Sequence, residues 1–407
     1  MSVILTEEHR IRCRHRDALY RRIDDFCYQV KNLHNSTNYL IRQSARISRK
    51  LKEEKPLEDW EEQLLREVNA AITRYGTGRK TALHPIDADH SFLADAYFLS
   101  WYRKDTENYR AVPYATCSQI CIQELCRAWK SFYRGLQAYN RAPGAMTGRP
   151  HAPGYLDPAK GRGQLVLTSQ NFRILPDGTL LLPSFLKGIR IRPAHSGIRQ
   201  LRIVTTEDSI LVQLMYEAEE LPLTEDTGIM GIDLGVSNLM AVTTDGKEEP
   251  VLISGKPLKS MNQYYNKKKA RLQELSRKSN GLFTTEKLRK LGARRNRKVK
   301  DYLHKASRKV IRLARERHIG LIVIGNNKGW KQAVSLGKKT NQNFVSIPFA
   351  TLIDMIRYKA ALAGIRVEVV SEQYTSGTSC LDGEMPEKRY YNKSRRISRG
   401  LLIRAWA

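Results

Sequence analysis

The chain has 407 residues, of which 41% are hydrophobic, so it is long enough to form two or three domains, each with a core of its own. Its formal charge is +29 and its pI is near 9.9, and a surplus of that size repels itself unless a polyanion neutralises it, which favours a nucleic acid partner. No run of 18 apolar residues occurs and the N-terminus has no apolar signal core, which argues against a membrane or secreted protein and favours the cytoplasm.

The first 140 residues are mostly helical by the spacing of their apolar positions. Residues 1–14 alternate loosely and predict one strand, after which apolar residues recur every three to four positions. This period predicts helices over 17–42, 57–75, 90–104 and 115–139. We interpret their aromatic and apolar positions mainly as core residues rather than as platforms for stacked bases.

The six cysteines follow neither a metal-binding nor a disulfide pattern. Cys117, Cys121 and Cys126 fall within the apolar stripe of the last predicted helix, and the other three are isolated. Because no Cys-x-x-Cys pair occurs, we expect reduced, mostly packed thiols and no zinc site.

A Pro- and Gly-rich break at 142–154 separates the helices from a segment with a period of two. The alternation predicts strands over 164–168, 179–182, 189–192, 200–204 and 209–215. A small antiparallel barrel fits these strands, and the opening strand can join it across the helical insertion. Arg190 and Arg192 would share one face of their strand, where contact with phosphate and simple solvation are both open.

From residue 227 onward the pattern changes again. It predicts strands over 229–234, 239–244 and 251–254, a basic helical region over 256–318, a strand over 321–324, a helix over 349–363 and a strand over 365–370. Three antiparallel strands followed by alternating helices and strands is the order of an RNase H-like domain.

The octet Gly231–Asn238 is the most informative motif of the chain. An apolar strand delivers one carboxylate, Asp233, and the next strand starts within a few residues. In an RNase H-like fold the first Mg²⁺-binding Asp is presented in this way, and Gly235 would let the backbone approach a phosphate. A buried Asp paired with a backbone amide at a hairpin is the alternative.

Most of the charge lies in residues 256–318, which contain 22 Lys and Arg against four Asp and Glu, a net charge of +18. A break near Ser279–Gly281 predicts two helices joined by a turn. A solvated helix face normally interleaves both signs, so we interpret this region as a surface for the nucleic-acid backbone. The residues expected to make these contacts are Lys267, Lys268, Lys269, Arg271, Arg294, Arg295, Arg297 and Lys298.

Four stretches together resemble TnpB, the transposon-encoded RNA-guided nuclease family also called OrfB, from which the type V CRISPR effectors descend. These stretches are 148–154, the Asp233 octet, 323–332 with 341–344, and 372–379. The resemblance implies a multi-domain α+β protein with a wedge β-barrel, an inserted helical recognition lobe and a RuvC domain of the RNase H-like class. The implied boundaries are 1–15 for the first barrel strand, 16–141 for the lobe, 142–226 for the barrel and 227–407 for the RuvC domain with basic helices 256–318.

The resemblance also implies a catalytic site of three carboxylates that hold Mg²⁺. The first carries over to Asp233. Most relatives place the second at the end of the central strand, where this chain has Gly325, whereas one branch supplies a Glu from the next strand, which matches Glu372. Parallel strands lie about 5 Å apart, so the longer side chain could reach the same ion. The third carboxylate lies near the C-terminus in relatives, but no Asp or Glu follows Glu387, and the ending looks truncated.

Two readings of function follow from the resemblance. A site short of one carboxylate beside an intact binding surface resembles TldR, nuclease-dead TnpB derivatives that use a guide RNA to occupy promoters and repress transcription. The alternative is an active RNA-guided DNA endonuclease with a rearranged site, in which Asp382 or Glu384 replaces the lost ligand. A decaying transposon remnant is a third reading.

The expected partners are a guide RNA and double-stranded target DNA in the bacterial cytoplasm, associated with the nucleoid, with Mg²⁺ bound weakly if at all. Further candidate contacts to RNA or phosphate are Trp330, Lys331, Gln332, Tyr374 and Thr375. Trp330 could equally anchor a loop, and Tyr374 and Thr375 could equally form a structural turn.

Overall fold

The computed structural model describes residues 2–13, 17–77, 83–91, 93–206, 209–246, 248–281, 284–326, 347–372, 385, 387, 396–398 and 401–402. The chain folds into two compact units. The N-terminal unit is Ile4–Glu217, and the C-terminal unit combines Ala218–Ala407 with Met1–Val3.

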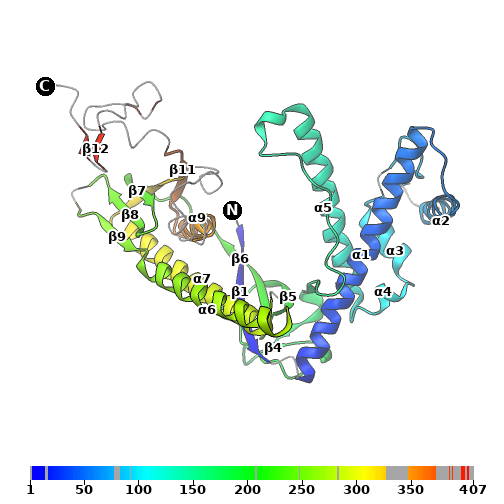
Figure 1. The fold of residues 1–407 in the computed structure, drawn as a ribbon, viewed down its shortest axis with the longest axis horizontal. Coiled ribbons are helices and arrows are strands. Elements are labelled where there is room, and N and C mark those ends of the chain that lie inside the picture. Colours follow the sequence, from blue (N-terminus) through cyan, green and yellow to red (C-terminus); the bar gives the residue numbers. More distant parts are fainter. Residues whose placement is uncertain are drawn as a thin grey trace. The chain divides into compact units, whose positions relative to one another are not determined.

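The N-terminal unit is built from helices of very different length (Figure 1). They are α1 (Ala18–Lys52), α2 (Asp59–Gly76), α3 (Ala96–Arg103), α4 (Glu107–Arg110), α5 (Ala115–Arg141) and the 3₁₀ turns η1 (Pro143–Ala145), η2 (Ser169–Asn171) and η3 (Ser184–Leu186). The four predicted helices are therefore confirmed, and α4 is an addition. The apolar stripes of α1 and α5 supply fully buried side chains such as Ile23, Leu33 and Leu125, because a period of 3.6 keeps such residues on one helix face.

The prediction that most thiols are packed is confirmed for four of the cysteines that the structure describes. Cys27 on α1 and Cys117, Cys121 and Cys126 on α5 are buried free thiols. Burial raises the pKa of each of these four thiols to about 12, so they stay protonated and pack as small apolar groups.

The longer strands of the N-terminal unit form a four-stranded sheet, and the predicted barrel is not confirmed. The strands of this unit are β1 (Ser2–Arg12), β2 (Leu165–Thr168), β3 (Arg173–Ile174), β4 (Leu180–Leu181), β5 (Ile198–Thr206) and β6 (Ser209–Glu219). The order β1-β6-β5-β2 confirms that the opening strand joins across the helical insertion. β3 and β4 pair only with each other, so in the described residues no closed barrel is found.

The prediction of a strand over 189–192 is wrong. Ile189 and Ile191 are buried and Arg190 and Arg192 are exposed, so the alternation itself is correct. Only a single bond, from the Leu180 amide to the Ile191 carbonyl at 2.8 Å, ties this segment to β4. The segment is extended but has no strand ladder, because β4 is only two residues long.

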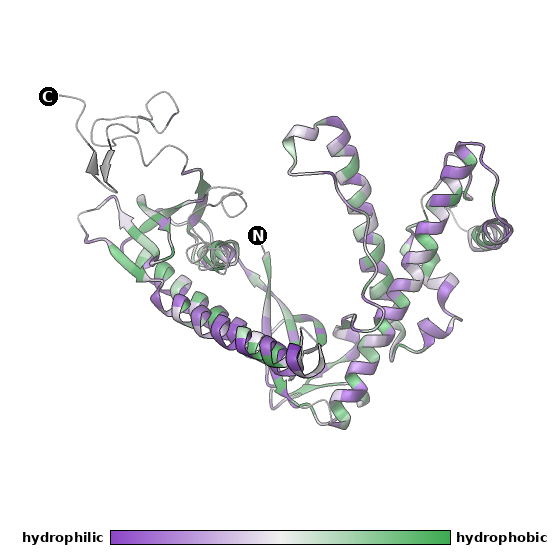
Figure 2. Cartoon of the chain, in the orientation of Figure 1, coloured by the Kyte–Doolittle hydropathy of each residue, from purple (hydrophilic) through white to green (hydrophobic). Residues whose placement is uncertain are grey.

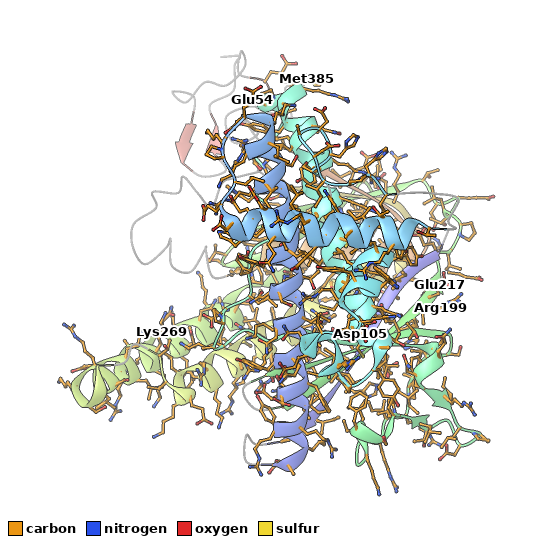
Figure 3. All side chains as sticks on the ribbon, turned by 90° about the vertical axis from the view of Figure 1, so that its right-hand side faces the viewer. Glu54, Asp105, Arg199, Glu217, Lys269 and Met385 are labelled. Carbon is orange, nitrogen blue, oxygen red and sulfur yellow. The ribbon has the colours of Figure 1, made fainter. Side chains whose placement is uncertain are left out.

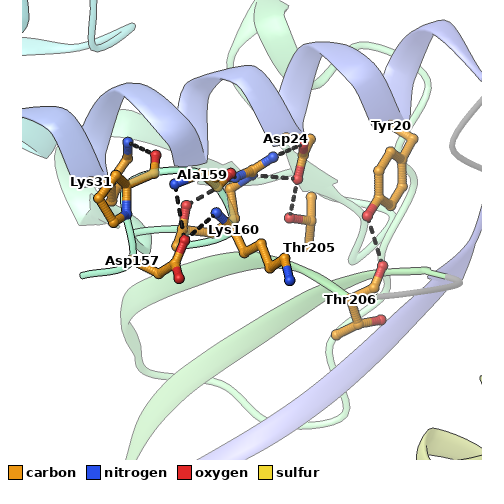
Figure 4. A network of polar contacts seen from close by, with 11 residues as sticks. Tyr20, Asp24, Lys31, Asp157, Ala159, Lys160, Thr205 and Thr206 are labelled. Carbon is orange, nitrogen blue, oxygen red and sulfur yellow. Dashed lines mark hydrogen bonds and ion pairs between the residues drawn. The ribbon is translucent and has the colours of Figure 1, made fainter. Parts of the chain in front are cut away.

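A network of polar contacts holds the segment before β2 against the N-terminal part of α1 (Figure 4). Arg162 makes a bidentate contact to Asp24 at 2.8 and 2.9 Å, and Asp24 also accepts from the Thr205 hydroxyl at 2.8 Å. The Tyr20 hydroxyl donates to the Thr206 carbonyl at 2.8 Å. Helix α1, the connection before β2 and strand β5 are thus joined by groups far apart in sequence.

The C-terminal unit is a five-stranded mixed sheet with helices. Its strands are β7 (Gly228–Leu234), β8 (Asn238–Thr244), β9 (Val251–Ser254), β10 (Ile319–Gly325) and β11 (Arg366–Val370), and its helices are α6 (Lys256–Asn280), α7 (Glu286–Glu316) and α9 (Phe349–Ala361). The short strands β12 (Arg396–Ser398) and β13 (Leu401–Leu402) pair with each other. The sheet order is β11-β10-β7-β8-β9, with β7, β8 and β9 antiparallel and β10 and β11 parallel to β7. The predicted element order is therefore confirmed, and Gly364 ends the helical region at a φ of +70° as expected.

One face of this sheet carries the core. Met230, Ile232 and Leu234 of β7 are buried in one apolar cluster with residues of α7 and α9. Alternation along the strand then places Ile229, Gly231 and Asp233 on the opposite face. This is the face that presents the candidate carboxylates.

Candidate functional site

Asp233 is exposed near the C-terminal end of β7. Its neighbours Ile232 and Leu234 are both 3% exposed and point into the core. The alternative reading, a buried Asp held by a backbone amide, does not describe this side chain. Strand β7 thus delivers one carboxylate to the sheet face that faces away from α7 and α9.

The turn after Asp233 needs glycine at two positions. The Gly235 amide donates to the Leu239 carbonyl at 3.2 Å, and a Cβ on Gly235 would lie 2.6 Å from the Asn238 carbonyl oxygen. Gly255 closes on the same turn, because its amide donates to the Ser237 carbonyl at 2.7 Å and a Cβ there would lie 3.0 Å from the Val236 carbonyl carbon. The octet therefore packs against the start of α6, where Gly255 is the N-cap residue.

Glu372 lies two residues past the end of β11, and its side chain crosses to β10. The strands are in parallel register, with Gly325 opposite Val370, and the Asn326 amide donates to the Val370 carbonyl at 2.9 Å. A Cβ on Gly325 would lie 2.6 Å from both Cγ and Cδ of Glu372. Gly325 therefore leaves the space that the Glu372 side chain fills.

The two carboxyl groups meet. Burial raises the pKa of Glu372 to about 7, and the negative charge of Asp233 and a hydrogen bond between the two side chains add to the rise. Such a bond needs a proton on one of the two groups. The raised pKa means that Glu372 keeps its proton to a higher pH than an ordinary glutamate does, and its ionised form adds a second negative charge beside Asp233.

The donor set fits a hard divalent cation. Mg²⁺ prefers carboxylate oxygens, and Asp233 and Glu372 would hold it from two strand ends. Bound there, the ion would neutralise the pair and polarise a phosphate oxygen. In the part of the chain that the structure describes, no three His, Cys, Asp or Glu side chains gather as a metal site. Asp382, Glu384, Tyr374 and Thr375 lie outside the described residues, as do Trp330, Lys331 and Gln332.

The basic region folds as a helical hairpin, as predicted. Gly281 ends α6 in the left-handed conformation with a φ of +69°, and the Thr285 hydroxyl caps α7 by accepting from the Leu288 amide at 3.3 Å. Figure 2 shows hydrophilic residues along both helices with an apolar stripe between them. Tyr302 on α7 donates to the Ser254 carbonyl at 2.5 Å, which links the hairpin to β9.

Each acid of the hairpin is paired within its own helix. The ion pairs along the helices include Glu274–Lys278, Glu286–Lys290, Asp301–Lys305 and Glu316–Arg312. With 22 Lys and Arg against four Asp and Glu, the segment has 18 more cations than acids, so most of its positive charge cannot be neutralised within the hairpin. The result is a dense positive surface, on which polyanion backbone is the matching ligand.

The predicted contact residues are distributed along this hairpin. Figure 3 shows its side chains projecting from the helices, with Lys269 labelled. Lys267, Lys268 and Arg271 on α6 are exposed, as are Arg294, Arg297 and Lys298 on α7, whereas Lys269 and Arg295 are half-buried. Arg190 and Arg192, in the other unit, are exposed, but Arg192 donates through Nε to the Asp177 carbonyl at 3.1 Å and so also has a structural role.

Two tyrosines of α6 were missed from the sequence. Tyr264 is 60% exposed, with the Lys268 ammonium 6.0 Å from its ring centre, and Tyr265 has the Arg295 guanidinium 5.9 Å from its ring centre. The adjacent Tyr-Tyr in a helix otherwise rich in Lys was the available signal. Aromatic rings among cations are typical of surfaces that hold unpaired bases.

Two family models match the C-terminal unit and the end of β6. The OrfB model described as a probable transposase matches residues 213–331, and the Cas12f1-like TNB domain matches residues 349–400. A CRISPR-associated endodeoxyribonuclease Cas12f2 of Micrarchaeota archaeon (strain CG1_02_47_40) is 30% identical over 182 residues. The two matched models and this relative support a TnpB-like family. The match covers 44% of this TnpB-like chain and 33% of the relative, so the chain spans about a third of the length of that protein.

Two solved structures match this TnpB-like chain at low sequence identity. A cryo-EM structure of a Cas12f1-sgRNA-target DNA complex matches at 12% identity and a TM-score of 0.46, over 97% of this chain and 93% of that one. A cryo-EM structure of a CRISPR-Cas12f ternary complex matches at 12% identity and a TM-score of 0.32, over 92% and 76%. The observed fold is a mixed α+β protein of more than one unit. In the described part of this TnpB-like chain, no helix is both long enough and apolar enough to span a bilayer.

Proposed function

We propose that this protein uses a guide RNA to bind double-stranded DNA beside a short motif and represses transcription there without cutting. The observation that carries the proposal is the charge of the α6–α7 hairpin. Its four acids each pair with a cation of the same helix, and residues 256–318 contain 18 more cations than acids. In RNA-guided recognition, base pairing reads the sequence and the protein holds the heteroduplex by its backbone. A hairpin with a high density of Lys and Arg can make such contacts to the phosphate backbone. The wedge and RuvC assignments are part of this proposal.

The charge of the carboxylate pair supports binding without cleavage. Two-metal displacement gathers two divalent cations about 3.5–4 Å apart, and so needs several anionic ligands. Asp233 and Glu372 supply at most two negative charges. This donor set suits one weakly held cation better than two.

An RNA-guided DNA endonuclease is the second candidate. It is favoured by the convergence of Asp233 and Glu372 from neighbouring strands and by the fit of the Glu372 side chain over Gly325. In this candidate the pair holds Mg²⁺ and a further ligand comes from outside the described residues.

One purification separates the candidates. The full chain is expressed with its flanking genomic DNA, its co-purified RNA is sequenced, and binding to a duplex that matches the 3′ end of that RNA is compared with a scrambled duplex. We expect selective binding, no strand cleavage with added Mg²⁺ or Mn²⁺, and equal binding by the wild type and Asp233→Ala. Cleavage that Asp233→Ala abolishes would establish the endonuclease, and absence of any discrete RNA would contradict RNA guidance.

A further inference from the structure

The two helices of the hairpin leave a hollow of about 280 Å³ between them. It is lined by Ser260, Met261, Tyr264 and Tyr265 of α6 and by Leu291, Arg294, Arg295 and Lys298 of α7. Small-molecule sites are usually about 300–1,000 Å³, so this hollow has room for one planar ring system rather than for a larger ligand.

The walls of the hollow combine aromatic rings with cations. Tyr264 is 60% exposed, an unusual exposure for a ring on a well-packed helix. Tyr265 lies over Gly292 of α7, where a Cβ would be 3.7 Å from its hydroxyl oxygen. None of the eight lining side chains is acidic, and three of them are cationic. The hollow therefore offers π-faces within a positive field.

One of these cations is held in place. The Arg295 Nε donates to Asn262 Oδ1 at 2.7 Å, and Asn262 is only 2% exposed. A second guanidinium nitrogen of Arg295 donates to Asn296 Oδ1 at 2.9 Å. Burial lowers the pKa of Arg295, so the surroundings are partly dehydrated. A fixed guanidinium beside Tyr265 loses little freedom when a ligand binds.

We propose that this hollow binds one unpaired nucleobase of a single strand, stacked on Tyr264, with Arg294 and Lys298 contacting the flanking phosphates. Rings among cations bind single strands by stacking plus backbone attraction, and any base has a π-face to offer. Inside a duplex each base is covered by its neighbours, so a paired strand cannot enter without extrusion. The inference rests on the proposed nucleic-acid function, and it gives the hairpin a preference for single strands that a purely cationic surface lacks.

The test compares strands with and without bases. The full chain, stripped of bound RNA, is titrated by fluorescence anisotropy with oligo-dT, oligo-rU and an abasic strand of equal length that carries the same phosphates. We expect Tyr264→Leu to weaken binding of the base-bearing strands about tenfold and to leave the abasic strand unchanged. Tyr264→Phe keeps the ring and should bind like the wild type. Arg294→Ala with Lys298→Ala should weaken all three strands equally.

Tyr97→Leu is the matched control, because Tyr97 is 75% exposed on α3, outside the hairpin, and should change no affinity. An unchanged ratio of base-bearing to abasic affinity in Tyr264→Leu would overturn the inference, and so would equal binding of all strands by the wild type, although the proposed function would survive. If the wild type binds no strand at all, the proposed function itself fails. A larger base-dependent gain with RNA assigns the site to the guide, and a larger gain with DNA assigns it to the displaced strand.

Discussion

At the residue scale, Gly325 at the end of β10 leaves the space that the side chain of Glu372, just past the end of β11, occupies. The Glu372 side chain lies where a side chain on Gly325 would be, and it meets Asp233 there. A carboxylate beside Asp233 can thus come from the end of β10 or from the residues that follow β11. The sequence indicated the pair, but the fit depends on the register of Gly325 opposite Val370.

Gly325→Ala should separate the carboxylate pair. Its Cβ would lie 2.6 Å from Cδ of Glu372, so the glutamate must leave its partly buried position beside Asp233. Because burial and Asp233 are what raise the pKa of Glu372 to about 7, we expect that pKa to fall towards its ordinary value of 4.5. An NMR titration of the Glu372 carboxyl carbon measures the change.

Gly231→Ala is the control for this substitution. Gly231 lies on the same sheet face, and a Cβ there would lie 3.4 Å from the Thr243 methyl group, so no side chain has to leave. A Glu372 pKa that stays near 7 in Gly325→Ala would show that the glutamate does not depend on the space over Gly325.

Asn38 is the buried residue that joins three parts of the N-terminal unit. It is 0% exposed, its amide donates to the Pro153 and Gly154 carbonyls at 3.1 Å each, and its oxygen accepts from the Trp129 indole at 2.9 Å. Asn38→Ala would leave these groups buried without partners. We expect the free energy of unfolding to fall by about 3 kcal/mol, measured by urea denaturation.

The control for Asn38 lies on the same helix. Asn32 is only half-buried and contacts only Gln29 of its own helix, at 3.2 Å, so Asn32→Ala should change stability by less than about 1 kcal/mol. Equal losses in the two variants would mean that α1 does not hold residues 153–154 through Asn38.

At the element scale, Gly292 weakens the second turn of α7. A Cβ there would meet nothing closer than the Tyr265 hydroxyl at 3.7 Å, which is an ordinary contact. Gly292→Ala should therefore stabilise the protein by about 0.5–1 kcal/mol, because alanine loses less backbone entropy in a helix. Thermal unfolding followed by circular dichroism measures the gain.

Gly281→Ala should have the opposite sign. Gly281 has a φ of +69°, which an L side chain adopts only with strain, and it ends α6 there. If both alanine variants lower the melting temperature, the hollow between the helices has no room for the extra methyl group.

Lys359 couples helix α9 to α7 and gives the contact a pH dependence. Its ammonium donates to the His304 carbonyl at 2.9 Å and to the Ser307 hydroxyl at 2.6 Å. Burial lowers the pKa of Lys359 from 10.5 to about 8, and the positive charge of Arg308 adds to the fall. The folded state therefore releases this proton at a lower pH than the unfolded state does.

The sign of the effect follows from proton linkage. Between about pH 8 and 10.5 the unfolded state binds more protons at Lys359, so this residue makes stability rise with pH in that window. Lys359→Met removes the titration. We expect the difference in unfolding free energy between wild type and variant to shift in favour of the wild type as the pH rises from 8 to 10, measured by urea denaturation at several pH values. A constant difference would contradict the lowered pKa.

At the scale of the whole molecule, charge is concentrated in one hairpin. Residues 256–318 carry a net +18 of the total +29. The N-terminal unit instead pairs many of its cations, as in the contacts of buried Glu61 with Lys50 at 2.5 Å and Arg46 at 3.2 Å. Nucleic-acid affinity should therefore depend on the hairpin far more than on total charge.

Removing part of that charge should reduce the salt dependence of binding. Lys267, Lys268 and Lys269 changed together to Ala should weaken binding to any duplex and lower the slope of log affinity against log salt by up to about 0.9 per lost phosphate contact. Lys52, Lys55 and Arg66, each paired with an acid of the N-terminal unit, form the matched triple control and should leave the slope unchanged. Equal slopes for the two triple variants would contradict a special role for the hairpin.

The sequence by itself determined the features that repeat along the chain. Apolar periods predicted the four long N-terminal helices and the β7–β11 order, and the break at Gly281 predicted the hairpin, because each pattern reports only which face of one element is buried. Asp233 could be singled out for the same reason, since its strand and its glycines are local signals. The site roles assigned to it and to Glu372 stay predictions.

Only the tertiary structure decided how elements meet. The predicted barrel is not confirmed, and residues 189–192 are not a strand, because ladder formation depends on partners that alternation does not specify. The fit of Glu372 over Gly325 comes from the register of two strands, and the tyrosine hollow comes from the packing of α6 on α7. The carboxylate pair and the hollow each bring together residues more than 20 positions apart in the sequence. Such contacts depend on three-dimensional packing and cannot be predicted from the local spacing of apolar residues.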